Sequence, residues 1–303
     1  MRYPDFFVGG VPRAGTTSLH YRLADVAEVS MPIIKEPRFF ELKDNVNLNY
    51  EGPGDVSKKS RYVATEEEYE NLFNPLKKLW GDATPTYFHS KKALENIREL
   101  CSEPKFIFVL RDPVDRAFSH YMQNVSSGNE SLDFISALRQ SGKRVRNLGW
   151  HLTWDICGYS LYTQRAKCWV DAFGRESILF VRYEDLHVCP LDTWLNIADF
   201  LGVDSGDQGV GVFNSSGEDR SRILRTVLQF ITRYKRFLAK VVPTIIWSRS
   251  QILFHKIKNM NKVKLEDVSC VERAAALEFF IEDIESLEVY LNWDLTSWKA
   301  DER

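Results

Sequence analysis

The chain has 303 residues, of which 44% are hydrophobic and 27% are charged, and its formal net charge is −2. This length can bury a substantial core. A net charge so close to zero gives no general attraction to nucleic acid, so we expect no nucleic-acid partner. The sequence contains no run of about 18 apolar residues, the length that would span a membrane.

The chain enters an expected strand at residues 5–8, which leaves no room for a signal peptide. Its five cysteines are scattered and show neither CxxC nor Cys/His ligand spacing, so we expect no metal site. An odd, scattered set of cysteines is simplest in a reducing compartment, and we therefore expect a cytoplasmic protein.

The first strand leads into a loop bounded by Gly10 and Gly15, and a helix is expected over about 17–26. This is the glycine spacing of a P-loop, which directs backbone N–H groups and the positive end of a helix toward one anion. Thr16, however, stands where a loop that binds nucleoside triphosphates has lysine, and Arg13 supplies a cation within the loop instead. The pattern favours an anion site other than that of an ATPase or kinase.

The next notable segment, residues 31–40, places Lys35 and Glu36 side by side before Pro37. A helix of ~10 residues rises ~15 Å, so the chain after it is long enough to turn back toward the loop. The pair then has two interpretations. It is an ordinary surface ion pair, or it belongs to the same site as the loop.

Thr65 is expected to begin a helix that runs through Phe73, and Ser90 to cap a helix over 91–100. Residues 105–110 form a continuous apolar run, typical of a strand buried on both faces. Arg111 follows this strand, at the edge where ligands bind in open α/β sheets. Ser119 lies ~9 Å further along the next helix, so that Arg111 and Ser119 can hold one phosphate. A helix cap with an ion pair explains the Arg-Asp-Pro sequence equally well.

A further buried strand is expected over 177–181 and a long helix over 271–291. Strands that alternate with helices predict an α/β fold, with a parallel sheet between two layers of helices as in P-loop proteins. We expect one domain over residues 1–303.

Residues 220–264 contain no acidic side chain and many basic ones at helical spacing, and we expect this segment to be a helical lid or insertion. Its basic face is either solvated, a wall that attracts an anionic ligand, or a surface for peripheral contact with a membrane.

Taken together, in this order and spacing, these segments resemble the sulfotransferases that use 3′-phosphoadenosine 5′-phosphosulfate (PAPS), in the branch of bacterial and heparan-sulfate enzymes. Residues 10–19 resemble the loop for the 5′-phosphosulfate, residues 111–119 the 3′-phosphate site, and residues 35–40 the segment of the catalytic base. Residues 81–87 are similar to a stretch that borders the acceptor cleft. Residues 214–216 and 220–222 are similar to a late loop that closes over the nucleotide.

The resemblance implies in-line transfer of a sulfuryl group to a hydroxyl or amine, without a metal, leaving adenosine 3′,5′-bisphosphate (PAP). Glu36 would be the general base, and Arg13 and Lys35 would stabilise the leaving phosphate oxygen. The residues implied to bind the donor are Arg13, Ala14, Gly15, Thr16, Thr17, Ser18, Arg111, Ser119, Tyr183, Ser216, Arg220 and Arg222.

Ala83 stands where the heparan-sulfate enzymes have lysine, which argues against specificity for a glycosaminoglycan, and the expected acceptor is a small molecule or a saccharide. Two alternatives remain. A P-loop nucleotide kinase would need a lysine at the position of Thr16, and a non-catalytic protein would bind an anion or a membrane surface through residues 220–264.

Overall fold

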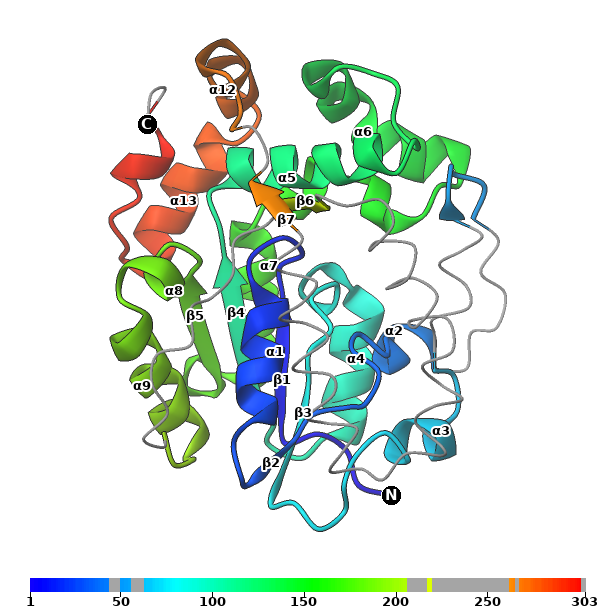
Figure 1. Cartoon of the computed structure of the whole chain (residues 1–303), viewed down its shortest axis with the longest axis vertical. Coiled ribbons are helices and arrows are strands. Elements are labelled where there is room, and N and C mark those ends of the chain that lie inside the picture. The colour runs from blue at the N-terminus through cyan, green and yellow to red at the C-terminus, as the bar shows by residue number, and fades with distance from the viewer. Residues whose placement is uncertain (44–49, 56–62, 206–216, 220–261, 265–266, 301–303) are drawn as a thin grey trace.

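A computed structural model describes residues 1–43, 50–55, 63–205, 217–219, 262–264 and 267–300 (Figure 1). Within them a parallel sheet of five strands has the order β2-β3-β1-β4-β5. Its strands are β1 (Phe6–Gly10), β2 (Val29–Ser30), β3 (Leu79–Asp82), β4 (Lys105–Leu110) and β5 (Ile178–Arg182). The expected parallel α/β fold is thus confirmed.

Helices connect these strands and continue beyond the last of them. They are α1 (Thr16–Ala24), α2 (Phe39–Leu42), α3 (Glu66–Glu70), α4 (Lys91–Leu100), α5 (Pro113–Ser126), α6 (Phe134–Leu148), α7 (Thr163–Phe173), α8 (Asp185–Val188), α9 (Pro190–Leu201), α12 (Cys270–Leu277) and α13 (Ile281–Leu291). Two further strands, β6 (Gly217–Asp219) and β7 (Lys262–Lys264), form a separate antiparallel pair. No helix in the described part of the chain is both long and apolar enough to cross a bilayer.

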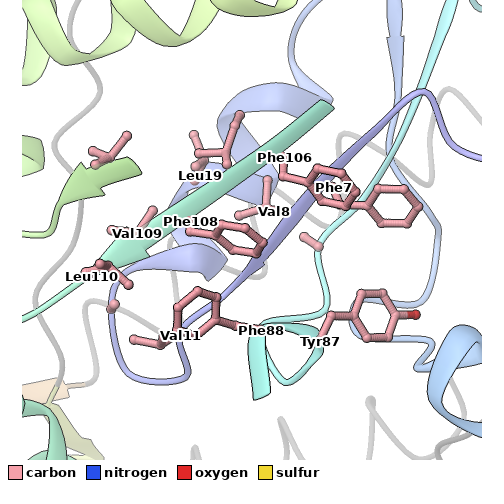
Figure 2. Packing of buried hydrophobic residues seen from close by; sticks show 14 of the residues in the cluster. Phe7, Val8, Val11, Leu19, Tyr87, Phe88, Phe106, Phe108, Val109 and Leu110 are labelled. Atoms are coloured by element: carbon pink, nitrogen blue, oxygen red, sulfur yellow. The ribbon is translucent and has the colours of Figure 1, made fainter. Parts of the chain in front are cut away.

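The sheet is covered on both sides, with α1 in front of the strands and α7 behind them in Figure 1. On the α7 side the aromatic rings of the strands pack against that helix. The centre of the Trp169 ring lies 4.9 Å from that of Phe106 and 5.2 Å from that of Phe108. Phe7 stacks on Phe106 at 5.5 Å, and Figure 2 shows both rings within the same cluster of buried side chains. The strands β1 and β4 are buried almost throughout because both faces of the sheet are covered.

The strand registers decide which residues meet at the carboxyl edge of the sheet. Leu110 pairs with Arg182, so Arg111 and Tyr183 leave their strands side by side, and Tyr183 N–H donates to the Leu110 carbonyl at 2.7 Å. On the other side of β1, Phe7 is in register with Asp82. The chain connections change direction between β1 and β4, which is where an open α/β sheet forms its binding crevice.

The prediction of a single helix over 271–291 is wrong, because the chain turns between α12 and α13. The turn is made by short i to i−3 hydrogen bonds from Phe279 to Ala276 and from Phe280 to Leu277. It buries Phe280 completely, together with Ile284 and Leu287 on the next helix. Burial of these apolar side chains therefore outweighs the continuity of the helix.

Candidate functional site

The loop between β1 and α1 has the backbone of an anion-binding turn. Arg13 and Gly15 both adopt positive φ, 74° and 76°, and α1 begins directly after Gly15. Among the described residues no side chain caps α1, and its first turn carries no acidic residue. Its free N–H groups and its positive end are therefore available to an anion.

A glycine is required at position 15 for a second reason. A Cβ added there would lie 3.2 Å from the Tyr183 ring, closer than ordinary van der Waals contact. Tyr183 in turn supports Arg111, whose guanidinium carbon lies 4.6 Å from the centre of that ring. The end of β5 is thus packed against both the loop and the cation at the end of β4.

Arg13, Arg111 and Ser119 converge, although they come from three separate segments. Arg13 Nε donates to Ser119 Oγ at 3.0 Å, and Arg111 donates from one terminal nitrogen to the Arg13 carbonyl, also at 3.0 Å. Arg111 Nε is buried and has no hydrogen-bond partner among the described residues. The loop and the segment after β4, two separate pockets in the sequence-based hypothesis, are joined directly by hydrogen bonds.

A third guanidinium, Arg116, lies close to this cluster and was not predicted from the sequence. Arg116 is completely buried, and it donates to Ser160 Oγ at 2.6 Å and to the Ile156 carbonyl at 2.5 Å. These acceptors are neutral and do not compensate its charge. Burial, together with the positive charges of Arg111 and Arg116, lowers the pKa of Arg13 to about 10. Such a concentration of positive charge favours a bound anion.

The remaining residues of the loop fall into two groups. Ala14 and Thr16 are buried. The Ala14 N–H donates to the Val11 carbonyl at 3.2 Å, so a backbone contribution to an anion would come from Thr16. Thr17 and Ser18 lie in the first turn of α1, and both are half-buried. Ser216, Arg220, Arg222 and the basic segment up to residue 261 lie outside the described residues.

Lys35 and Glu36 lie on an unusual stretch of backbone before α2. Lys35 Nζ contacts the Glu36 carboxylate, and the Lys35 side chain is 15% exposed against 42% for Glu36. Glu36 and Arg38 both have positive φ, 59° and 58°. The Glu36 charge is one of those that act on the pKa of Arg13, which it raises. The Glu36 carboxylate therefore lies within electrostatic range of Arg13.

The residues after Glu36 are fixed in the protein interior. The Arg38 guanidinium pairs with the Glu41 carboxylate and contacts His151 Nε2 at 2.9 Å, and all three residues are buried. A second network surrounds Asp82 at the end of β3. The resemblance singled out residues 81–87, but the network itself was not predicted, because the four residues Leu79–Asp82 are too few to indicate a strand in the sequence.

Comparison with known proteins identifies the family and the fold. A model of the sulfotransferase family matches residues 4–207, about two thirds of the chain. The mouse heparan sulfate glucosamine 3-O-sulfotransferase 3B1 is 32% identical over 123 residues, which are 40% of this chain and 30% of that protein. The human bifunctional heparan sulfate N-deacetylase/N-sulfotransferase 2 is 26% identical over 208 residues, 67% of this chain and 22% of that protein.

These curated relatives are longer proteins, and the chain spans about a third or less of their length. Among solved structures, the sulfotransferase from Alicyclobacillus acidocaldarius has a similar fold over nearly the whole chain. Its TM-score is 0.73 at 23% identity, with 99% of this chain and 100% of that one covered.

Proposed function

Because the chain belongs to the sulfotransferase family, we propose that it transfers the sulfuryl group of PAPS to a hydroxyl or amine of a small-molecule or saccharide acceptor, with Glu36 as general base. One observation carries the proposal. The loop cation Arg13 is hydrogen-bonded to Ser119 and carries Arg111 on its carbonyl, next to an uncapped helix end. Cations and N–H donors thus converge where a nucleotide with two phosphate groups would need them.

The donor set fits PAPS in both number and chemistry. The loop and the first turn of α1 would hold the 5′-phosphosulfate through backbone N–H groups, Thr17 and Ser18. Arg111 and Ser119 would hold the 3′-phosphate. Arg111 Nε, which has no partner within the part of the chain that the structure describes, is a donor that such a phosphate would satisfy. The Tyr183 ring keeps the Arg111 guanidinium in place.

The transfer requires two contributions from side chains of this protein. Glu36 removes the proton of the acceptor group as its oxygen or nitrogen bonds to sulfur. Arg13 and Lys35 stabilise the phosphate oxygen that keeps the electron pair of the broken S–O bond. The donor supplies an activated sulfuryl group, whereas position and charge come from the protein.

The contact between Lys35 and Glu36 supports this division of roles. The contact places a cation directly beside the carboxylate that would take the proton. The similar proteins include a 3-O-sulfotransferase and an N-sulfotransferase of heparan sulfate, which supports a saccharide among the candidate acceptors.

The proposal is tested by incubating the purified protein with PAPS and a panel of alcohols, amines and saccharides. We expect acceptor-dependent formation of PAP, together with an acceptor that gains the mass of one sulfuryl group. Glu28→Gln is the control for a Glu36→Gln variant. It removes a carboxylate that pairs with Lys78 at 3.2 Å directly before β2, at the amino end of that strand. Absence of PAP formation with every acceptor, in protein that binds PAP, would contradict the proposal.

A further inference from the structure

Asp82 is a buried carboxylate that the proposed chemistry does not use. It ends β3, is completely buried, and lies in register with Phe7 of β1. Its oxygens accept hydrogen bonds from Tyr69 Oη at 2.7 Å, Thr84 Oγ1 at 2.7 Å and Tyr87 Oη at 3.1 Å. Burial of a carboxylate costs free energy even when three hydroxyl groups donate to it. Its position therefore indicates a role beyond packing.

One of these donors connects Asp82 to the segment that carries Glu36. While Tyr87 donates its proton to Asp82, its hydroxyl oxygen accepts a hydrogen bond from Phe40 N–H at 3.4 Å. The carbonyl of Phe40 accepts from Asn96 Nδ2 at 2.7 Å. Both backbone groups of Phe40 are therefore held by side chains of other elements.

The aromatic rings secure the same point. Phe39 stacks on Tyr69 at 4.4 Å, and Phe40 meets Phe7 edge to face at 5.4 Å. Both phenylalanines are completely buried. The start of α2 is thus attached to the central sheet by its rings and by its backbone.

Only three residues separate Phe40 from Glu36, and they allow little freedom. Pro37 fixes its own φ, and Arg38 has positive φ and is held by Glu41 and His151. Movement of the Phe40 backbone is therefore passed to the Glu36 carboxylate rather than absorbed between the two residues.

We propose that Asp82 is a positioning residue for Glu36, and that it acts through the Tyr87 hydroxyl on the backbone of Phe40. The inference rests on the proposed function, because it assigns to Asp82 the placement of the general base. Tyr69 and Thr84 complete the hydrogen bonding of the carboxylate, whereas Tyr87 is the donor that also bonds to Phe40.

Two matched variants test the proposal. Tyr87→Phe removes the hydroxyl that joins Asp82 to Phe40, and Tyr69→Phe removes a second hydroxyl that donates to the same Asp82 oxygen. We expect Tyr87→Phe to lower kcat on the order of tenfold to a hundredfold, with unchanged affinity for PAP and faster amide exchange at Phe40. Tyr69→Phe should keep kcat within about twofold at a similar loss of thermal stability.

Asp82→Asn should resemble Tyr87→Phe, and the milder tyrosine variant decides the question if the asparagine variant does not fold. Equal kcat in the two tyrosine variants, or a loss of PAP affinity that accounts for the lower rate, would overturn the proposal. The proposal would also be overturned if the wild type forms PAP and the Glu36→Gln variant forms it at the same rate. If the wild type forms no PAP, the proposed function has failed, and unchanged exchange at Phe40 in Tyr87→Phe overturns the attachment as well.

Discussion

Arg13 Nε donates a hydrogen bond to Ser119 Oγ at 3.0 Å, across 106 positions of the sequence. The contact joins the loop after β1 to the helix after β4, at the place where the strand connections change direction. Because Arg111 donates to the carbonyl of the same arginine, the three residues are coupled to one another. A change at any of them is expected to weaken the binding of PAP.

Removal of the Arg111 guanidinium tests the 3′-phosphate site. A charge-assisted hydrogen bond contributes about 1.5–3 kcal/mol, so Arg111→Ala should weaken PAP binding by roughly 10- to 150-fold in calorimetry. The affinity for adenosine 5′-phosphate, which lacks the 3′ group, should change much less. Arg182→Ala is the matched control, because Arg182 ends the neighbouring strand and pairs with Asp185. Equal PAP affinity in Arg111→Ala and wild type would remove Arg111 from the site.

Glu36→Gln separates binding from chemistry. The amide keeps the size of the side chain but cannot take the proton of the acceptor group, so kcat should fall by about 10²- to 10⁴-fold. PAP affinity should stay within a few-fold of the wild type, since the anion contacts lie on the loop and after β4. The rate is measured as PAP formed per unit time with a responsive acceptor. A variant that retains its full rate would show that another group takes the proton.

Gly15→Ala tests the close approach of Tyr183 to the loop. Positive φ costs an L-residue roughly 1–2 kcal/mol, and the added methyl group must also displace the Tyr183 ring. Gly149→Ala provides the control, because Gly149 has φ of 64° with nothing within 4 Å of the added carbon. We expect both variants to lose stability in urea unfolding, and Gly15→Ala alone to lose PAP affinity. Equal PAP binding in the two variants would argue against a tight fit.

The titration of Asp82 predicts how stability changes with pH. Burial raises the pKa of Asp82 from 3.8 to about 6, against the opposing effect of its three hydroxyl donors. Between these values the folded protein holds a proton that the unfolded chain has lost. The contribution of Asp82 to stability is therefore complete below pH ~4 and falls by about 3 kcal/mol as the pH rises through 6.

Unfolding free energies of wild type and Asp82→Asn between pH 4 and 7 check this sign. The difference between the two proteins should shift in favour of the asparagine variant as the pH rises, because asparagine does not titrate. Other carboxyl groups are common to both proteins and cancel in the difference. A difference that is constant over this range would place the Asp82 pKa outside it.

Much of the sheet edge could be predicted from short patterns. The apolar run at 105–110 and the Asp112-Pro113 start of the next helix indicated the place of Arg111, and Ser90 caps α4 as expected. These signals are local, because a buried strand and a helix cap depend on neighbouring residues. The loop at Gly10 and Gly15 is local in the same sense.

Contacts between distant segments left no such pattern. The position of Asp82 depends on the register of β3 against β1, and that of Arg116 on Ser160 and Ile156, which lie 44 and 40 residues further along the chain. The turn at Phe280 depends on what this side chain packs against, since the sequence alone continues its helical spacing. Burial against distant parts of the chain decides these features, and the residues adjacent in sequence do not indicate that burial.

The neutral acceptors around the Arg116 guanidinium have a practical consequence for anyone who handles the protein. Before an anion arrives, Arg13, Arg111 and Arg116 repel one another in a medium of low polarity. Inorganic sulfate or phosphate in a storage buffer is expected to relieve that repulsion and, by binding the native state in preference to the unfolded chain, to protect the protein against heat. The same salts are expected to compete with the nucleotide, so the buffer that preserves the preparation best is the one in which an assay would understate its activity.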